Sequence, residues 1–240
     1  MRHRIGVTLR RPGIVVPAVL AGIVLSWLGI GWATLPDVIS LAEAWPDTTA
    51  YMRIRVAQAV RRGDTLRIRY HPVQLSDVPA SLRRAVLVSE DAGFYDHSGF
   101  DWHEIRAAFE KARREREMPR GASTITQQLA RNVYLSPRRA PTRKLREAFI
   151  TRRLEKELPK SRILALYLNI IELGPGLFGV DAASREYFGI PVSAVSRRQA
   201  AMLAATIPSP LLDNPATDTR RFRWRTDLIA GRAFAPARPE

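Results

Sequence analysis

The sequence predicts a mainly α-helical domain preceded by one N-terminal transmembrane helix. Three observations support this fold class. Residues 14–32 contain no charged side chain, apolar residues recur at helical spacing from residue 81 onward, and residues 65–70 alternate polar and apolar side chains as a short strand does. We find no internal repeat or low-complexity segment that points to another architecture.

Residues 14–32 are long enough to cross a bilayer, since these nineteen residues span about 28 Å at the helical rise of roughly 1.5 Å. Four arginines lie in residues 1–13, whereas Asp37 and Glu43 follow the apolar segment. The positive-inside rule therefore places the N-terminus in the cytoplasm and the rest of the chain outside. A cleaved signal peptide is the alternative, because residues 42–44 read Ala-Glu-Ala, but its apolar core is usually about 7 to 15 residues long. We expect an uncleaved single-pass anchor in a bacterial cytoplasmic (inner) membrane, with a periplasmic domain behind it.

The charge balance points to an anionic partner. The chain has 38 basic and 23 acidic side chains, a formal charge of +15, which suits phosphate, diphosphate, nucleic acid or acidic lipid. Outside the cytoplasm we do not expect nucleic acid. The chain has no cysteine, which excludes disulfides and thiolate metal sites.

The chain divides into five segments. They are a basic cytoplasmic tail (1–13), the anchor (14–32), a connector with some helical character (33–64), a globular domain (65–235) and a short tail (236–240). Capping and breaker residues divide the globular domain further. After a first helix that begins near residue 81, we expect helices over residues 102–117, 124–135, 142–158, 161–173, 181–188, 200–207 and 219–230.

Three of these helices have distinctive sequence signals. Ser123 is expected to cap the helix over 124–135, and Ser196 with Gln199 forms a capping box. The helix over 161–173 is apolar on nearly every side, so we expect it to be buried all round.

The stretch from Val88 to Asp101 combines acids, a histidine and aromatic residues. Glu90 and Asp91 disfavour each other's ionisation, and Phe94 can desolvate one of them, so a carboxyl pKa here can rise into the range of a general base or acid. The alternative is a pair of solvated surface acids. A metal site built from His97, Asp101 and His103 matches no established spacing, so a structural hydrogen bond by His97 is the better interpretation.

Two later stretches can bind an anion. Residues 121–132 place hydroxyls and amides at a helix start, where free N–H groups and the helix dipole attract negative charge, although an ordinary cap explains Ser123 equally well. Arg143, Lys144 and Glu147 share one sector of a helix. They can bind a diphosphate or simply form intrahelical ion pairs.

The order of these motifs resembles the peptidoglycan glycosyltransferases of glycosyltransferase family 51. Residues 90–101 read Glu-Asp-x-x-Phe-x-x-His-x-Gly-x-Asp, residues 121–128 read Gly-x-Ser-Thr-Ile-Thr-Gln-Gln, and Arg-Lys-x-x-Glu and Ile-Leu-x-x-Tyr-Leu-Asn follow at 143–147 and 163–169. The resemblance covers about residues 70–210. The chain has a predicted N-terminal anchor and contains no Ser-x-x-Lys or Lys-Thr-Gly motif. In these respects it resembles the monofunctional biosynthetic form, which has no transpeptidase domain.

The resemblance implies a lysozyme-like helical domain that polymerises lipid II at the outer face of the membrane. The growing glycan chain on its lipid diphosphate is then the donor, and the α-linked diphosphate becomes a β-1,4 linkage with inversion. By matching position, Glu90 is expected to be the general base, and Glu147 to support the leaving diphosphate directly or through a divalent cation such as Mg²⁺ or Mn²⁺. No cofactor is required by the resemblance, and other cell-wall synthesis proteins are candidate partners. The residues expected to bind substrate are Asp91, Ser123, Thr124, Gln127, Gln128, Arg131, Asn132, Arg143 and Lys144.

One residue departs from the family pattern, and two other functions stay open. Arg131 stands where the family has lysine, and arginine binds phosphate bidentately but is bulkier. A lysozyme-like enzyme that cleaves peptidoglycan also uses two carboxylates, but it does not need Arg143, Lys144 or a basic cleft. A non-catalytic membrane-tethered scaffold is the remaining alternative.

Overall fold

The computed structural model describes residues 16–19, 22, 26, 29, 31, 34–116, 123–137 and 140–235. By internal contacts the chain forms two compact units, Met1–Pro36 and Asp37–Glu240. The predicted tails (1–13 and 236–240) and most of the predicted anchor (14–32) lie outside the described residues. Within the described residues, no helix is both long enough and apolar enough to cross a membrane.

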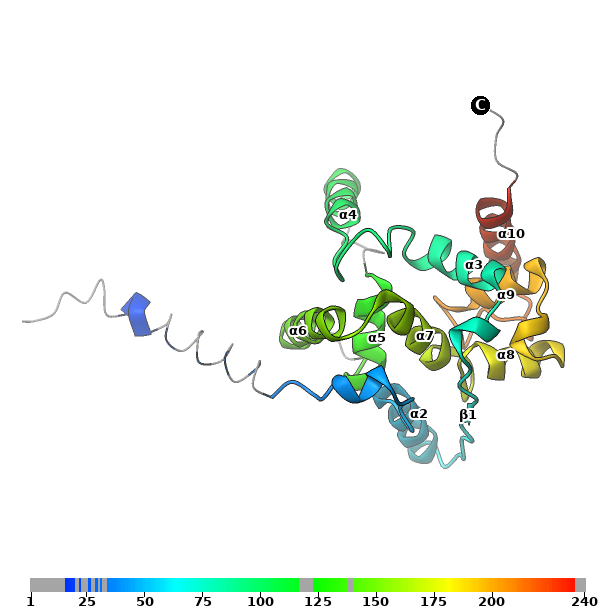
Figure 1. The fold of residues 1–240 in the computed structure, drawn as a ribbon, viewed down its shortest axis with the longest axis horizontal. Coiled ribbons are helices and arrows are strands. Elements are labelled where there is room, and N and C mark those ends of the chain that lie inside the picture. The colour runs from blue at the N-terminus through cyan, green and yellow to red at the C-terminus, as the bar shows by residue number, and fades with distance from the viewer. Residues whose placement is uncertain are drawn as a thin grey trace, which may run out of the picture. The chain divides into compact units, whose positions relative to one another are not determined.

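The second unit is mainly helical, as the sequence predicts, and its elements are labelled in Figure 1. The α-helices are α2 (Ala50–Arg61), α3 (Ala80–Glu90), α4 (Trp102–Glu115), α5 (Ile125–Tyr134), α6 (Pro141–Glu157), α7 (Lys160–Ile170), α8 (Val180–Phe188), α9 (Arg197–Thr206) and α10 (Arg220–Phe234). Short 3-10 helices are η1 (Ile39–Ala42), η2 (Leu75–Asp77) and η3 (Val192–Ala194).

A small sheet in the order β1-β3-β2 accompanies the helices. Strand β1 (Arg69–Tyr70) runs parallel to β3 (Leu177–Phe178), and β3 runs antiparallel to β2 (Glu172–Gly174). The strand predicted over residues 65–70 is therefore real but limited to its last two residues. Its partner lies more than a hundred residues away, which local alternation of side chains does not reveal.

The helix predicted over residues 161–173 ends at Ile170, which corrects our prediction at its C-terminal end. Gly179, with φ of 85°, lies so close to the carbonyl oxygen of Asn169 that a Cβ atom at this position would be 2.3 Å from it, so only glycine fits there. The side chain of Asn169 also bonds the backbone of Val73, donating to its carbonyl oxygen and accepting from its N–H, both at 2.9 Å. The residues after the helix form β2, which pairs with β3.

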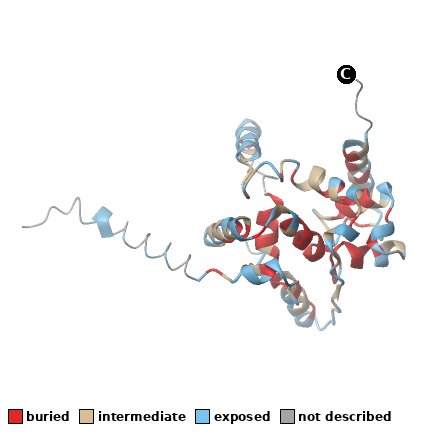
Figure 2. Cartoon of the chain, viewed as in Figure 1, coloured by how far each residue is buried: buried red, intermediate tan, exposed pale blue. Residues whose placement is uncertain are grey.

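The core is built around α5 and α7, which are red over most of their length in Figure 2. Every residue of α7 from Ile163 to Ile170 is buried, so the prediction of a helix buried all round is confirmed. Helix α5 packs against α6 and α7, whereas α3 packs against α9 and α10. The C-terminal end of α3 meets α5 between these two groups, and this junction carries the site described below.

The caps of α4 and α9 follow the sequence prediction, but the cap of α5 does not. Asp101 caps α4 through the N–H of Glu104 at 2.9 Å, and Ser196 with Gln199 forms the capping box of α9. Helix α5 is capped by Thr124 rather than Ser123, which corrects the prediction.

Candidate active site

Glu90 is the last residue of α3 and only partly exposed. Its Oε2 accepts a hydrogen bond from Nε2 of Gln128 on α5 at 2.9 Å. Burial raises the pKa of Glu90 to about 7, against the opposing effects of the Gln128 hydrogen bond and the charges of Arg225 and Arg131. Asp91 raises this pKa further but contributes least. The sequence predicted a raised pKa from the acid pair and Phe94; the larger cause is enclosure by the fold. A carboxyl group that titrates near neutral pH suits general acid–base chemistry.

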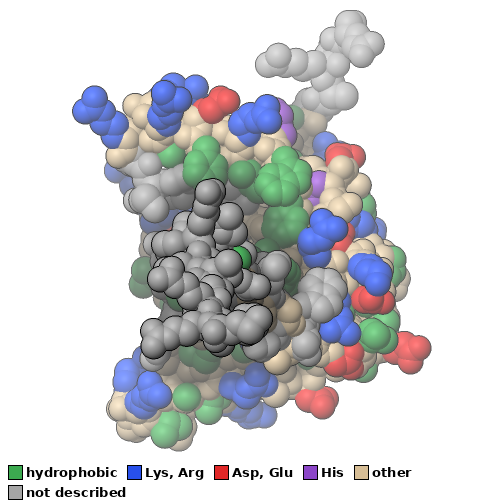
Figure 3. Space-filling model, turned by 90° about the vertical axis from the view of Figure 1, so that its left-hand side faces the viewer, with side chains coloured by type: hydrophobic (Ala, Val, Ile, Leu, Met, Phe, Trp, Pro, Cys, Tyr) green, Lys and Arg blue, Asp and Glu red, His purple; other side chains and the backbone are tan. Residues whose placement is uncertain are grey.

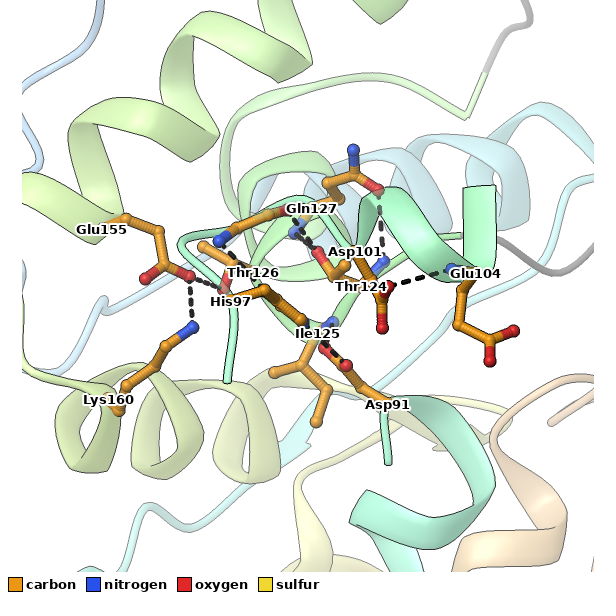
Figure 4. Close-up of polar contacts among 11 residues, drawn as sticks. Asp91, His97, Asp101, Glu104, Thr124, Ile125, Thr126, Gln127, Glu155 and Lys160 are labelled. Carbon is orange, nitrogen blue, oxygen red and sulfur yellow. Dashed lines mark hydrogen bonds and ion pairs between the residues drawn. The ribbon is translucent and has the colours of Figure 1, made fainter. Parts of the chain in front are cut away.

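Asp91 holds the loop after α3 against the start of α5 (Figure 4). It is 8% exposed, and each carboxylate oxygen has a partner. Oδ1 lies 2.9 Å from Nε2 of His97, and Oδ2 accepts from the N–H of Ile125 at 2.8 Å. Since the protein itself occupies both oxygens, the contact pattern of Asp91 is that of a residue that orients its neighbours.

A cavity of about 290 Å³ opens beside the end of α3, and we call it the acidic cavity. Carboxylates and hydroxyls line most of it, which suits hydrogen bonding to a sugar. Its lining residues are Val88, Ser89, Glu90, Asp91, Ala92, Gly93, Asp101, Glu104, Ser123, Thr124 and Arg232.

A second cavity of about 190 Å³, which we call the basic cavity, has Gln128 in its wall. It is lined by Tyr51, Arg55, Gln128, Arg131, Asn132, Ile171, Glu172, Ile207, Pro208 and Pro210. The Nε atom of Arg131 is buried and has no hydrogen-bond partner among the described residues. The hydrogen bond between Gln128 and Glu90 links the basic cavity to the acidic one, because each residue lines one of them.

Helix α2 contributes a residue that the sequence did not single out. Arg55 binds Glu172 through both carboxylate oxygens, from Nε at 2.7 Å and from one terminal nitrogen at 2.6 Å. This pair fixes α2 to β2 along one wall of the basic cavity. The sequence carries no local signal for it, because 117 residues separate the partners.

Thr124 and Gln127 are buried at the start of α5 and bond to each other. The N–H of Thr124 donates to Oε1 of Gln127 at 3.1 Å, and the N–H of Gln127 donates to the Thr124 hydroxyl oxygen at 3.3 Å. The hydroxyl of Thr124 also donates to the carbonyl of Gly99 at 2.8 Å. Gln127 therefore shapes the site through the backbone at the start of α5. Ser123 and Thr124 line the acidic cavity directly, and Asn132 lines the basic cavity.

Arg143, Lys144 and Glu147 form an ion-paired triad on α6, which confirms that they share one helix sector. Glu147 is fully buried; Arg143 binds its Oε2 at 2.6 Å, and Lys144 binds its Oε1. Neither the acidic nor the basic cavity includes a triad residue in its described lining. One carboxylate flanked by two cationic groups is a poor donor set for Mg²⁺ or Mn²⁺, so the residues at Glu147 do not fit the divalent cation considered from the sequence.

One further cluster brings possible metal ligands together. Ligand atoms of Asp91, His97 and Asp101 all lie within 4.8 Å of one another. However, Nδ1 of His97 accepts the N–H of Gly99 at 3.1 Å, and its Nε2 faces Asp91. Both ring nitrogens are thus engaged, which confirms the structural hydrogen-bonding role predicted for His97.

The described surface carries its basic groups in several places. On the face in Figure 3, Lys and Arg side chains stand along the upper and lower margins and also on the right, where most of the acidic side chains lie. The basic side chains that can be seen on this face therefore stand in several separate places.

Comparison with known proteins gives the family. A sequence profile described as Transglycosylase matches residues 58–233, well over half of the chain. The chain belongs to the transglycosylase family. This transglycosylase is 41% identical over 194 residues to a biosynthetic peptidoglycan transglycosylase of Nitrosospira multiformis, covering 81% of this chain and 84% of the relative.

Two other relatives carry the same name. The one from Laribacter hongkongensis is 39% identical over 220 residues, covering 87% of this transglycosylase and 96% of the relative. The one from an Azoarcus species is 44% identical over 196 residues, covering 77% and 85%. The family resemblance inferred from the motifs is thereby confirmed, and the mainly helical fold fits a transglycosylase domain.

Proposed function

We propose that this transglycosylase polymerises lipid II into linear β-1,4 peptidoglycan glycan strands, using a lysozyme-like helical domain. Family membership and the names of its relatives support transfer of glycosyl groups during peptidoglycan synthesis. The observation that carries the mechanism is the carboxyl group of Glu90, which lines the acidic cavity and has a pKa raised to about 7.

In this mechanism Glu90 is the general base. The 4-hydroxyl of the incoming lipid II gives its proton to the Glu90 carboxylate, and its oxygen forms a bond to C1 of the donor sugar. The bond between C1 and the diphosphate oxygen breaks, and the electron pair leaves with the diphosphate. Attack from the opposite face converts the α-linked donor into a β-linked product.

The basic cavity is the proposed place for the diphosphate. Arg131 and Asn132 both line this cavity, and they contribute a guanidinium group and an amide. Charge-assisted hydrogen bonds from arginine to phosphate are stronger than those between neutral groups. Arg143 and Lys144 do not line this cavity, so they are proposed to act on the leaving diphosphate through their charge, with Glu147 fixing both side chains.

The acidic cavity is the proposed place for the acceptor sugar. Ser123 and Thr124 line it directly, while Gln127 supports its wall through the cap of α5. Asp91 is proposed to act on substrate indirectly, by holding the loop that carries Glu90. A lipid-linked substrate requires work at the membrane surface, and the segment over residues 14–32 is the proposed anchor in the inner membrane.

Polymerisation of purified lipid II by the detergent-solubilised full chain tests this function. We expect glycan strands that lysozyme digests, and a loss of at least about a hundredfold in rate for Glu90→Gln, since a general base contributes that much or more. Glu110→Gln, at an exposed position of α4, is the matched control and is expected to polymerise normally. The assay is run with and without a chelator to measure any need for a cation.

A parallel incubation with finished peptidoglycan separates the alternatives. Release of sugar fragments from the polymer without chain growth from lipid II contradicts the synthase and supports a cleaving enzyme. Normal chain growth by Glu90→Gln contradicts the base assignment.

A further inference from the structure

Two hydrogen bonds connect Tyr167 to Glu90 through the amide of Gln128. The phenol of Tyr167, in the middle of α7, donates to Oε1 of Gln128 at 3.1 Å. Nε2 of the same amide donates to Oε2 of Glu90 at 2.9 Å. Tyr167 is fully buried and Gln128 is 9% exposed, so neither side chain can readily exchange its partner for bulk water.

The two contacts together select one orientation of the Gln128 amide. With Oε1 toward Tyr167, the NH₂ group points at Glu90 and can stabilise its ionised form. The reverse orientation sets the amide oxygen against a carboxylate oxygen, which is repulsive. Gln128 bonds Oε2 of Glu90, and among the described residues we find no partner for Oε1, which leaves this oxygen for an acceptor hydroxyl.

Core packing alone does not account for Tyr167. It lies in a helix whose residues from Ile163 to Ile170 are all buried, where phenylalanine would fill the same volume without a polar group. A buried phenol requires a hydrogen-bond partner, and here that partner is the residue that contacts the proposed base.

We infer that Tyr167 and Gln128 are positioning residues that hold the Glu90 carboxylate in the orientation in which it accepts the proton of the acceptor hydroxyl. This inference rests on the proposed function for its catalytic meaning. The contact chain itself is independent of that function.

The charged groups around Glu90 determine how its pKa changes when these hydrogen bonds are lost. The groups that act on it are Asp91 from the loop after α3, Arg131 from α5, Arg225 from α10 and the amide of Gln128. Burial raises the pKa of Tyr167 well above its usual value, so its phenol stays protonated and keeps donating at neutral pH. Without the phenol, the amide can turn away, and the Glu90 carboxylate loses the hydrogen bond that lowers its pKa.

The test is Tyr167→Phe in the full chain. Two quantities are measured: the pH profile of lipid II polymerisation, and the titration of the Glu90 carboxyl carbon by NMR after ¹³C labelling of glutamate, assigned with Glu90→Gln. We expect the Glu90 titration and the acid limb of kcat to move upward together by about half a pH unit or more. We also expect kcat to fall about tenfold, with KM within about twofold of wild type, because the base is displaced while the substrate contacts remain.

Tyr187→Phe is the matched control. It removes the same hydroxyl from a different contact, the hydrogen bond from Tyr187 to the carbonyl of Leu173 at 2.6 Å. This variant is expected to keep the wild-type Glu90 titration and pH profile.

A folded Tyr167→Phe with an unmoved Glu90 titration overturns the inference, whether or not overall activity has fallen, because a purely structural role predicts that result. If Tyr167→Phe does not fold, Gln128→Met takes its place and is expected to raise the pKa of Glu90 in the same way. An unchanged Glu90 pKa in Gln128→Met also overturns the inference. If the wild-type chain does not polymerise lipid II, the proposed function fails, yet the NMR titration still decides the positioning role.

Discussion

The carboxylate of Asp91 lies 2.9 Å from Nε2 of His97 and simultaneously receives the backbone N–H of Ile125, the first residue of α5. Asp91 therefore forms one contact within the loop that follows Glu90 and one with α5, the helix that carries Gln128. Lys160 on α7 lies over the ring of Phe94 at 4.3 Å from its centroid, which adds a third attachment of this loop to the core.

Asp91→Asn tests this attachment. An asparagine amide must present an N–H group either to His97 or to the N–H of Ile125, so one of the two bonds is lost and two donors face each other. We expect the free energy of unfolding, measured by urea denaturation, to fall by about 1–3 kcal/mol, with a parallel loss of polymerisation. Asp96→Asn, at an exposed position of the same loop, is the control. Equal stability of Asp91→Asn and wild type argues against a holding role.

The rate of polymerisation is expected to rise with pH through about 7, the pKa to which burial raises Glu90. A base must be ionised to accept a proton, so activity follows the deprotonated fraction and falls about tenfold for each pH unit below that value. A pH profile of kcat/KM from about pH 5 to pH 9 measures this. An acid limb near pH 4.5, the ordinary value for glutamate, contradicts an enclosed Glu90.

The same pKa predicts a gain in stability when Glu90 is neutralised. Its folded-state pKa lies above the ordinary glutamate value of 4.5, so between about pH 4.5 and 7 the folded chain holds a proton that the unfolded chain releases. The free energy of unfolding therefore falls as pH rises through this window and stays lower above it. We expect Glu90→Gln to be more stable than wild type at pH 8. The pKa shift sets an upper limit of about 3 kcal/mol on this gain, and solvent screening of the partly exposed carboxylate reduces it.

Glu147→Gln tests the triad on α6. The change removes the charge that pairs with Arg143 and Lys144 but keeps a hydrogen-bonding side chain. We expect a folded protein, less stable by about 1–2 kcal/mol, that polymerises lipid II at least about tenfold more slowly. Glu157→Gln, which removes an acid from a looser pair with Lys156 at 3.8 Å on the same helix, is the control. Wild-type turnover by Glu147→Gln would leave the triad with a structural role alone.

Arg131→Lys restores the residue found in the family pattern and tests the basic cavity. Lysine keeps the charge but loses the forked geometry of arginine, so we expect kcat/KM within about tenfold of wild type. Arg131→Ala removes the charge as well, and we expect a loss of about tenfold to a hundredfold, mainly in KM for lipid II. If Arg131→Ala binds and polymerises lipid II normally, the diphosphate does not use this cavity.

Local sequence signals were sufficient for features that depend on neighbouring residues. Helical periodicity predicted the apolar circumference of α7 and the common sector of Arg143, Lys144 and Glu147. Capping chemistry predicted the cap of α4 by Asp101. The motif order also identified the transglycosylase family, because residue types at fixed spacing are properties of the chain itself.

Features that depend on distant residues required the tertiary structure. Thr124 rather than Ser123 caps α5, and its hydroxyl reaches the carbonyl of Gly99, 25 residues earlier. The residues after α7 form β2, and its neighbour β3 pairs with β1, which lies more than a hundred residues earlier in the chain.

The sequence by itself determined the family, the mainly helical composition and the acid at position 90. Only the tertiary structure decided that burial raises the pKa of Glu90, that hydrogen bonds connect it through Gln128 to Tyr167, and that Arg55 lies in one wall of the basic cavity. The physical reason is that periodicity and capping act within a few residues, whereas burial and long-range hydrogen bonds arise when α3, α5 and α7 come together.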